Sequence, residues 1–256
     1  MSNPLNDGGI RRSDGIRVDM TVPRSYQISS WRRFPSLVHG FGSRHLQEQD
    51  LRDFGAEKGF QCVFLRQIHG DVFHVVKEPP QKTLRGDALI TSRCGIFLVV
   101  KTADCLPIFL MDRARSVIAA VHCGWRGTLG RLASRVVRGM TERFGCAPDS
   151  LQAALGPAID VGCYPVGPEV RSRFQSAGHP MDIFRRNPRE PENWRLDLRT
   201  ANRHQLLDAG LGENRIYSVD RCTHCETDLC SFRRDGEKAG RLFNYIGLTC
   251  EKDGCR

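Results

Sequence analysis

Short apolar runs of a few residues each dominate the first half of this sequence and restrict the fold that it can adopt. They are rich in Val, Ile, Leu and Phe and are bounded by Gly, Pro or charged residues, a pattern typical of β-strands. Because they do not alternate regularly with helical segments, an α+β arrangement is favoured. The predicted strands include residues 63–65, 72–76, 88–90, 97–100, 108–110 and 117–121.

Two later segments are predicted to be helices. The first carries an apolar stripe with three- and four-residue spacing, and Gly145 ends it. The second is expected at about 199–209, before Gly210. Residues 178–195 hold three prolines and few apolar side chains, so we expect a long loop or flap there. The stripe consists of Leu129, Leu132, Ala133, Val136, Val137, Met140 and Phe144.

The chain as a whole is predicted to form one α+β domain, with mixed β-sheets packed against helices. Residues 1–22 are polar and without periodicity, so we expect a loose N-terminal leader there. Residues 23–256 then form the single domain, because no internal repeat or sharp change in composition marks another boundary.

The composition is that of an ordinary globular protein, with 40% hydrophobic and 26% charged residues. The longest strongly apolar run, 95–100, is too short to cross a bilayer, so no membrane partner is expected. The first twenty residues carry charges and no apolar stretch, which predicts a cytoplasmic protein without a secretory signal. There the eleven cysteines should be reduced, and metal binding or catalysis is favoured over a disulfide framework.

The net charge of +9 raises the question of an acidic partner. The small basic clusters at 32–33, 185–186 and 233–234 are not interleaved with aromatic residues, as a platform for single-stranded nucleic acid would require. Nucleic acid is therefore not favoured as a partner, although a basic RNA-binding module stays open as the non-enzyme alternative. Its affinity would fall steeply with salt.

Three segments place a metal-binding side chain where a predicted strand ends. His69 follows the run at 63–65, Cys105 lies between two strands, and His122 ends the run at 117–121. Because the chain holds eight histidines and eleven cysteines, such a set also arises by chance. Spacing alone therefore leaves a metal site and ordinary structural roles open.

Glycines next to these residues keep bulky side chains away. Gly70 follows His69, while Gly124 and Gly127 bracket a predicted strand-to-helix turn that also contains Arg126. The start of a helix offers unpaired N–H groups and a positive dipole that suit phosphate. Simple turn formation is a serious alternative explanation for these glycines.

Several strings resemble, in order, those of the laccase-domain (YfiH-like) family, over residues 37–248. Two of them, TADC-x-P and VH-x-GWRG, are together highly specific. The resemblance implies an α+β enzyme that acts on purine nucleosides with zinc, formerly described as a polyphenol oxidase. The strings are RQIHG, GDALIT, TADCLPIFLMD, AAVHCGWRGTL, ALGPAIDVGCYPVGPEV and LDLRTANRHQL, with the C-terminal pattern RCT…FRRDG…GR.

The resemblance assigns the metal ligands to His69, Cys105 and His122. Three protein ligands leave a fourth zinc position open for water or substrate, as in catalytic sites. Zinc lowers the pKa of a bound water towards about 7. The implied reactions are phosphorolysis of adenosine, inosine or guanosine to the base and ribose 1-phosphate, and deamination of adenosine. The implied partners are purine nucleosides and phosphate, and the chain is expected to be a monomer or small homo-oligomer.

Six further residues are site candidates. Arg44, in the string FGSR, matches an element of the family and is the first candidate for phosphate, with Arg126 and Arg233 as weaker ones. Gln67 is expected to contact the base or a metal ligand. Asp104 either orients a ligand, transfers a proton or caps nearby backbone, and Asn202 either reaches the pocket or packs its helix.

Two strings depart from the family pattern. Arg44 is followed by HLQE rather than a glycine-rich segment. The family favours an aromatic residue before the serine of its Ser-Tyr-Arg element, whereas this chain has Cys230 before Ser231, Phe232 and Arg233.

Three alternatives for the function stay open. A copper-dependent polyphenol oxidase is ranked lower, because the histidines are scattered and multicopper sites need clustered pairs. The others are a thiol hydrolase using Cys105 with a histidine base, and an amidohydrolase of cell-wall precursors.

Five cysteines near the C-terminus are not explained by this site. The spacing of Cys222 and Cys225 hints at a metal or redox site. Without a matching second pair, a structural zinc is not favoured, and packed or surface thiols are expected. The five are Cys222, Cys225, Cys230, Cys250 and Cys255.

Overall fold

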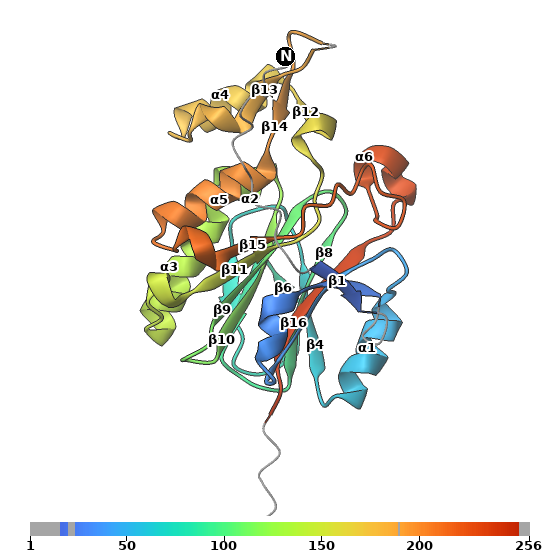
Figure 1. The fold of residues 1–256 in the computed structure, drawn as a ribbon, viewed down its shortest axis with the longest axis vertical. Coiled ribbons are helices and arrows are strands. Elements are labelled where there is room, and N and C mark those ends of the chain that lie inside the picture. Colours follow the sequence, from blue (N-terminus) through green and yellow to red (C-terminus); the bar gives the residue numbers. More distant parts are fainter. Residues whose placement is uncertain (1–15, 20–23, 189, 251–256) are drawn as a thin grey trace, which may run out of the picture.

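The computed structural model describes residues 16–19, 24–188 and 190–250. Its core is two large sheets packed face to face, with helices covering both outer faces (Figure 1). The described residues thus confirm the predicted α+β class with mixed sheets and helices. No helix among them is long and apolar enough to cross a membrane.

One sheet has seven described strands and the other has six. The first, in spatial order, consists of β1 (Ile16–Asp19), β2 (Ser25–Ile28), β3 (Leu37–Gly42), β16 (Leu242–Leu248), β8 (Ile96–Thr102), β4 (Gln61–Arg66) and β6 (Leu84–Arg85). The second consists of β15 (Ile216–Ser218), β11 (Gln152–Leu155), β9 (Leu106–Asp112), β10 (Val117–Cys123), β7 (Ala88–Thr91) and β5 (Phe73–Val75).

The central strands read as continuous apolar runs because both of their faces are buried. In β9, Ile108 and Leu110 point to the helical side, whereas Phe109 points to the facing sheet. In β8, the side chain of Leu98 lies between the sheets, and its neighbour Phe97 lies on the outer face. Alternate side chains of a strand point to opposite faces, so each strand contributes to two core layers.

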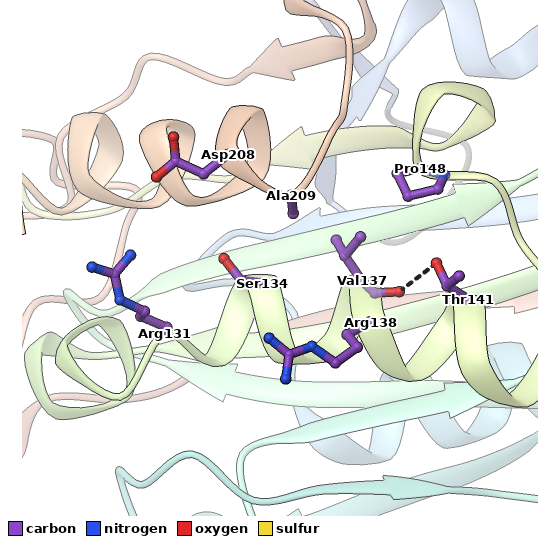
Figure 2. A pocket seen from close by; sticks show the side chains of 8 residues that line it. All are labelled: Arg131, Ser134, Val137, Arg138, Thr141, Pro148, Asp208 and Ala209. Carbon is purple, nitrogen blue, oxygen red and sulfur yellow. Dashed lines mark hydrogen bonds between the residues drawn. The ribbon is translucent and has the colours of Figure 1, made fainter.

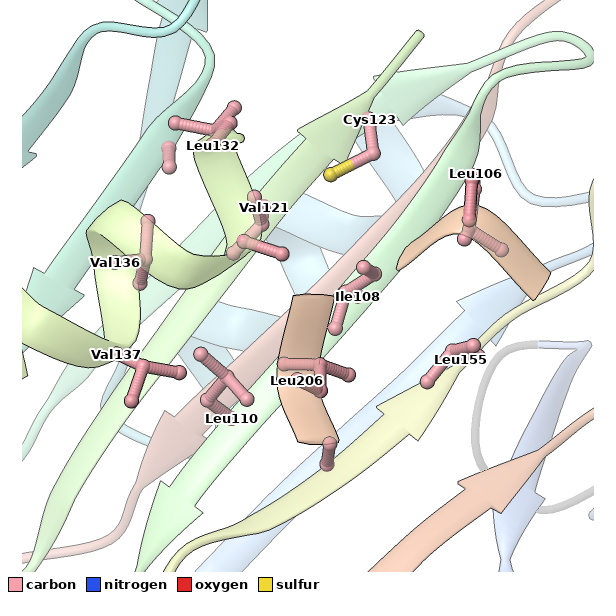
Figure 3. Close-up of a cluster of buried hydrophobic side chains, with 14 of the residues drawn as sticks. Leu106, Ile108, Leu110, Val121, Cys123, Leu132, Val136, Val137, Leu155 and Leu206 are labelled. Atoms are coloured by element: carbon pink, nitrogen blue, oxygen red, sulfur yellow. The ribbon is translucent and has the colours of Figure 1, made fainter. Parts of the chain in front are cut away.

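Helices α3 (Leu132–Phe144) and α5 (Leu198–Asp208) cover the six-stranded sheet, and α1 (Glu48–Glu57) covers the seven-stranded one. Leu132, Val136 and Val137 of α3 pack with Leu206 of α5 over β9 and β10 (Figure 3). Both helices lie where the sequence predicts them. The left-handed backbone of Gly145, with φ 68°, ends α3. Leu129, the first residue of the predicted stripe, belongs instead to the short helix α2 (Trp125–Leu129).

Residues 178–195 are not simply a loop, which corrects the prediction. They include β13 (Phe184–Arg186) and most of β14 (Trp194–Leu196), which pair with each other and with β12 (Pro165–Val166). The Trp194 ring stabilises this small sheet, because the guanidinium groups of Arg171 and Arg186 stack on it at 4.2 and 4.3 Å. The sheet and α4 (Pro168–Ser176) form one end of the molecule (Figure 1).

Two further expectations need correction. Within the predicted loose leader, residues 16–19 form β1, which is held by antiparallel pairing with β2, while residues 1–15 and 20–22 lie outside the described residues.

Not all cysteines are thiols, because Cys94 and Cys250 form a disulfide. It joins the turn before β8 to the residues after β16, two adjacent strands of one sheet. Cys255 lies outside the described residues.

Candidate metal centre

The three predicted metal ligands come together in space. His69 follows β4, Cys105 precedes β9, and His122 lies near the end of β10. Their nitrogen and sulfur ligand atoms all lie within 4.8 Å of one another. The two imidazole rings meet edge to face with centroids 4.9 Å apart. His69 is exposed, Cys105 is half-buried and His122 is buried, so the group opens to solvent on the His69 side.

Two residues at this site have an unusual backbone conformation. His69 has a φ of 55° and Asp104, next to Cys105, has a φ of 90°. Both values lie in the left-handed region, which non-glycine residues rarely adopt. Only two other described non-glycine residues, Ser116 and Arg131, share it. Such strain persists where the surrounding contacts fix the chain, and here it sets the direction of two of the three ligand segments.

Asp87, which the sequence analysis did not select, holds two of these segments. It is completely buried directly before β7, and its carboxylate accepts hydrogen bonds from the backbone N–H groups of His69 and Gly70 at 2.9 and 2.7 Å. It also accepts one from Nδ1 of His122 at 2.8 Å. Its only signal in the sequence is the string GDALIT, in which a lone acid precedes a buried strand.

The ligands polarise one another. Burial alone would raise the pKa of Cys105, but the charge of His122 and hydrogen bonds from His122 and His69 lower it to about 6. Burial alone would lower the pKa of His122, but the Cys105 thiolate and the Asp87 carboxylate raise it to about 9. Cys105 and His122 therefore each favour the charged form of the other, as in other activated cysteines.

This donor set fits zinc. Two imidazole nitrogens and one thiolate are accepted zinc ligands, and three protein ligands are typical of catalytic sites. The bond from Nδ1 of His122 to Asp87 leaves Nε2 of that ring to face a metal. A carboxylate behind a histidine is the usual partner of a metal-bound imidazole. His69, Cys105 and His122 are therefore the residues that would hold the ion.

The glycines of the following turn are required by close packing. A Cβ atom on Gly124 would lie 3.0 Å from Sγ of Cys105, and one on Gly127 would lie 2.8 Å from the backbone oxygen of Gly70. Gly124 is the residue before α2, so the thiol occupies the space that a side chain would take. The turn is thus packed closely against the candidate ligand Cys105 and the segment of His69.

Asp104 and Gln67 are both bonded to backbone or side chains beside the ligands. The carboxylate of Asp104 accepts hydrogen bonds from Oγ1 of Thr223 at 2.7 Å and from the backbone N–H of Arg233 at 2.6 Å. The amide of Gln67 donates to the backbone oxygen of Lys101 and accepts from its N–H, at 2.8 and 2.7 Å. These bonds attach neighbouring segments to the two ligand-bearing loops.

Arg126 and Arg233 both lie near Tyr164, another residue that the sequence analysis did not select. The Arg233 guanidinium lies over the Tyr164 ring at 5.3 Å from its centroid. Burial raises the pKa of Tyr164, as does the negative charge of Cys105, whereas Arg233 and Arg126 act in the opposite direction. Two cations and one phenol therefore lie within electrostatic range of the metal centre.

The remaining two candidates have partners of their own. Arg44 forms an ion pair of 3.5 Å with Asp235, which in turn accepts a hydrogen bond from Arg234. Asn202 is fully buried and donates to Oγ1 of Thr128 at 2.9 Å, so it joins α5 to α2.

A separate pocket lies between α3 and the C-terminal end of α5 (Figure 2). None of the site residues predicted from the sequence lines it. Its lining residues are Arg131, Ser134, Val137, Arg138, Thr141, Pro148, Asp208 and Ala209.

The family of proteins described as multi-copper polyphenol oxidoreductase laccases matches residues 45–249, which include every candidate residue above except Arg44. The chain belongs to this family. A solved structure, that of a hypothetical protein YfiH from Bacillus licheniformis, superposes with a TM-score of 0.81 at 27% identity and covers 92% of this chain and 100% of that one.

Two proteins that are similar in sequence to this chain carry the names of purine enzymes. A purine nucleoside phosphorylase of Deinococcus radiodurans is 39% identical over 72% of this chain and 69% of its own length. Adenosine deaminase RL5, from an unknown prokaryotic organism, is 44% identical over 62% of this chain and 61% of its own length. The match thus spans somewhat less than two thirds of the second relative.

Proposed function

We propose that this chain is a zinc-dependent enzyme of purine nucleosides, which splits adenosine, inosine or guanosine with phosphate and also deaminates adenosine. The observation that carries the proposal is the convergence of His69, Cys105 and His122 in a chain whose relatives are named purine nucleoside phosphorylase and adenosine deaminase. A zinc ion held there would supply a Lewis acid and lower the pKa of a bound water.

The protein's own groups prepare that centre. The lowered pKa of Cys105, about 6, keeps its sulfur in the thiolate form that metals require at neutral pH. Asp87 fixes the His122 ring and, through the backbone N–H of His69, the segment of the second histidine. The centre is thereby preorganised, and little reorganisation is needed when substrate binds.

Phosphorolysis requires an anion beside the ribose. In that reaction a phosphate oxygen forms a bond to C1′, the C1′–N9 bond breaks, and the purine leaves with a proton. Arg126 and Arg233 supply positive charge near Tyr164 and the metal centre, and guanidinium groups bind phosphate oxygens well. Phe232, next to Arg233 and 52% exposed, offers an aromatic face for the purine ring.

Deamination of adenosine requires no phosphate. The oxygen of water forms a bond to C6, the bond from C6 to the amino nitrogen breaks, and ammonia leaves. The two reactions therefore share the nucleoside but differ in the attacking group and in the carbon attacked, which is C1′ for phosphate and C6 for water. The exposed side of the centre, at His69, admits either.

The test is chromatography of adenosine and inosine incubated with protein of known metal content, with and without phosphate. We expect phosphate-dependent adenine and hypoxanthine, phosphate-independent inosine from adenosine, and loss of all three products in Cys105→Ala. Full turnover by that variant would overturn the proposal. Unchanged nucleosides in the presence of bound zinc would redirect the search to amide substrates such as cell-wall precursors.

Zinc is proposed rather than copper because the histidines are not clustered. His39, His74 and His179 each bond a backbone group with a ring nitrogen, and among the described residues only His69 and His122 share one candidate ligand group. A multicopper oxidase needs clustered histidine pairs. Stoichiometric copper in protein purified without added metal, together with oxidation of a phenol, would instead favour the polyphenol oxidase.

A further inference from the structure

A second group of metal-binding side chains lies away from the first centre. Cys163 ends the 3-10 turn Val161–Cys163, and His224 and Cys225 belong to the loop after β15. The ligand atoms of these three residues lie within 4.8 Å of one another. The sulfur atoms of Cys163 and Cys225 are 3.3 Å apart, well beyond the roughly 2.05 Å of a disulfide bond.

Cys222 brings a third thiol next to this group. Its sulfur accepts a hydrogen bond from the backbone N–H of Asp160 at 3.3 Å, directly before the turn that carries Cys163. Its backbone forms a β-bridge with Ala158, which fixes the position of the loop. Two segments thus bring their thiols together, although Cys163 and Cys225 are 62 residues apart in the sequence.

We propose that Cys163, Cys222, Cys225 and His224 bind a second zinc ion, which joins the segment 158–164 to the loop 220–226. Three cysteines and one histidine are a recognised ligand set of structural zinc sites, and the two-residue gap between Cys222 and Cys225 is the spacing such sites use. The thiols release their protons to solvent as they bind the metal. Cys225 is exposed, so the ion has a route to the site.

The two segments that this ion joins also contact residues beside the first centre. Thr223, next to Cys222, donates its hydroxyl hydrogen to Asp104, the neighbour of Cys105. Tyr164, next to Cys163, lies beneath the guanidinium of Arg233. The second ion therefore has a structural role: it fixes the segments that carry Thr223 and Tyr164 beside the first centre.

The test is the zinc content of the reduced full chain, measured by mass spectrometry after loading with zinc and desalting. The proposal expects about two ions per chain for the unaltered protein and about one each for Cys105→Ala and Cys225→Ser. A chain carrying both changes should hold none. Cys62→Ser, which alters a half-buried thiol on β4, is the matched control and should keep both ions.

Thiol labelling separates a metal site from an oxidised pair. With zinc bound, Cys163, Cys222 and Cys225 should resist alkylation, and a chelator should expose all three. His224→Cys should retain the second ion and His224→Ala should bind it more weakly, with circular dichroism unchanged in both. One ion in the unaltered chain that Cys225→Ser does not remove, or a disulfide among these three residues in reduced protein, would overturn the proposal.

Discussion

The carboxylate of Asp87 accepts a hydrogen bond from Nδ1 of His122 at 2.8 Å, and both side chains are almost completely shielded from solvent. The same carboxylate binds the backbone on either side of the exposed ligand His69. One buried acid thus sets the orientation of one ligand ring and the position of another ligand's backbone. This explains how a centre can be fixed although its ligands come from three separate segments.

Replacing Asp87 by Asn should weaken zinc binding at the first centre by about 10- to 100-fold, the usual effect of removing the partner of a metal-bound histidine. The neutral amide loses the charge that favours a proton on Nδ1 and therefore a free Nε2. Competition with a chromogenic chelator measures the change. Asp53→Asn, an exposed carboxylate on α1, is the control. Equal affinities for both variants would contradict this role.

Replacing Gly124 by Ala should weaken zinc binding about tenfold through overpacking against Cys105. The backbone φ of −76° suits alanine, so only the contact at 3.0 Å with the thiol opposes the new Cβ atom. Gly212→Ala is a matched control, because its Cβ would meet the flexible Oδ1 of Asn214 at the same distance. Competition with the same chromogenic chelator measures the zinc affinity of both variants. An unaltered affinity of Gly124→Ala would contradict close packing of Gly124 against the Cys105 thiol.

Replacing Asn202 by Ala should lower the free energy of unfolding by about 1–3 kcal/mol, because it removes buried hydrogen bonds to Thr128 and Leu198. The KM for nucleoside should not change, since the side chain packs α5 against α2. Urea unfolding and steady-state kinetics measure the two effects. Arg203→Ala, which breaks only an exposed ion pair with Glu213, should change stability little. A raised KM with normal stability would assign Asn202 to the substrate site instead.

Acid should destabilise the fold partly through His39. Burial, with a smaller contribution from Arg32, lowers the pKa of His39 from 6.5 to about 3, and its Nε2 accepts a hydrogen bond from the N–H of Ile28. Because the unfolded chain binds the proton more readily, this contribution is complete above pH 6.5 and declines as the pH falls towards 3. Between neutral pH and pH 5 the loss is about 2 kcal/mol.

Urea unfolding at pH 7 and pH 5 tests this contribution in the unaltered chain and in His39→Gln. The variant should lose less stability than the unaltered chain over this interval, because glutamine does not titrate. Parallel losses in the two proteins would mean that His39 is not the group responsible.

The three candidate metal ligands were assigned by the family resemblance, because the spacing of histidines and cysteines alone left structural roles open. Asp87 could not be predicted, because its role depends on strand register. The pairing of Ala88 with Val121 in β7 and β10 brings Asp87 beside His122, although 35 residues separate them. A register of this kind is set by tertiary packing rather than by the local pattern.

The strands in the segment 178–195 could not be predicted from the local sequence. They are only three residues long and carry little apolar pattern, so the three prolines led to the prediction of a loop. The contacts that stabilise them come from Arg171 on α4, which the local sequence does not reveal. Likewise, the proximity of Cys163 and Cys225 cannot be predicted from the sequence. It depends on the β-bridge between Ala158 and Cys222, which brings their two segments together.

The position of β16 has a consequence for how the protein is made. Leu242–Leu248 lies between β3 and β8 and pairs with both, so the last described strand completes the middle of a sheet whose other strands were synthesised earlier. Until it emerges from the ribosome, β3 and β8 each have an unpaired edge that can recruit other chains. A premature stop codon before residue 242 therefore produces an aggregation-prone polypeptide rather than a weakened enzyme.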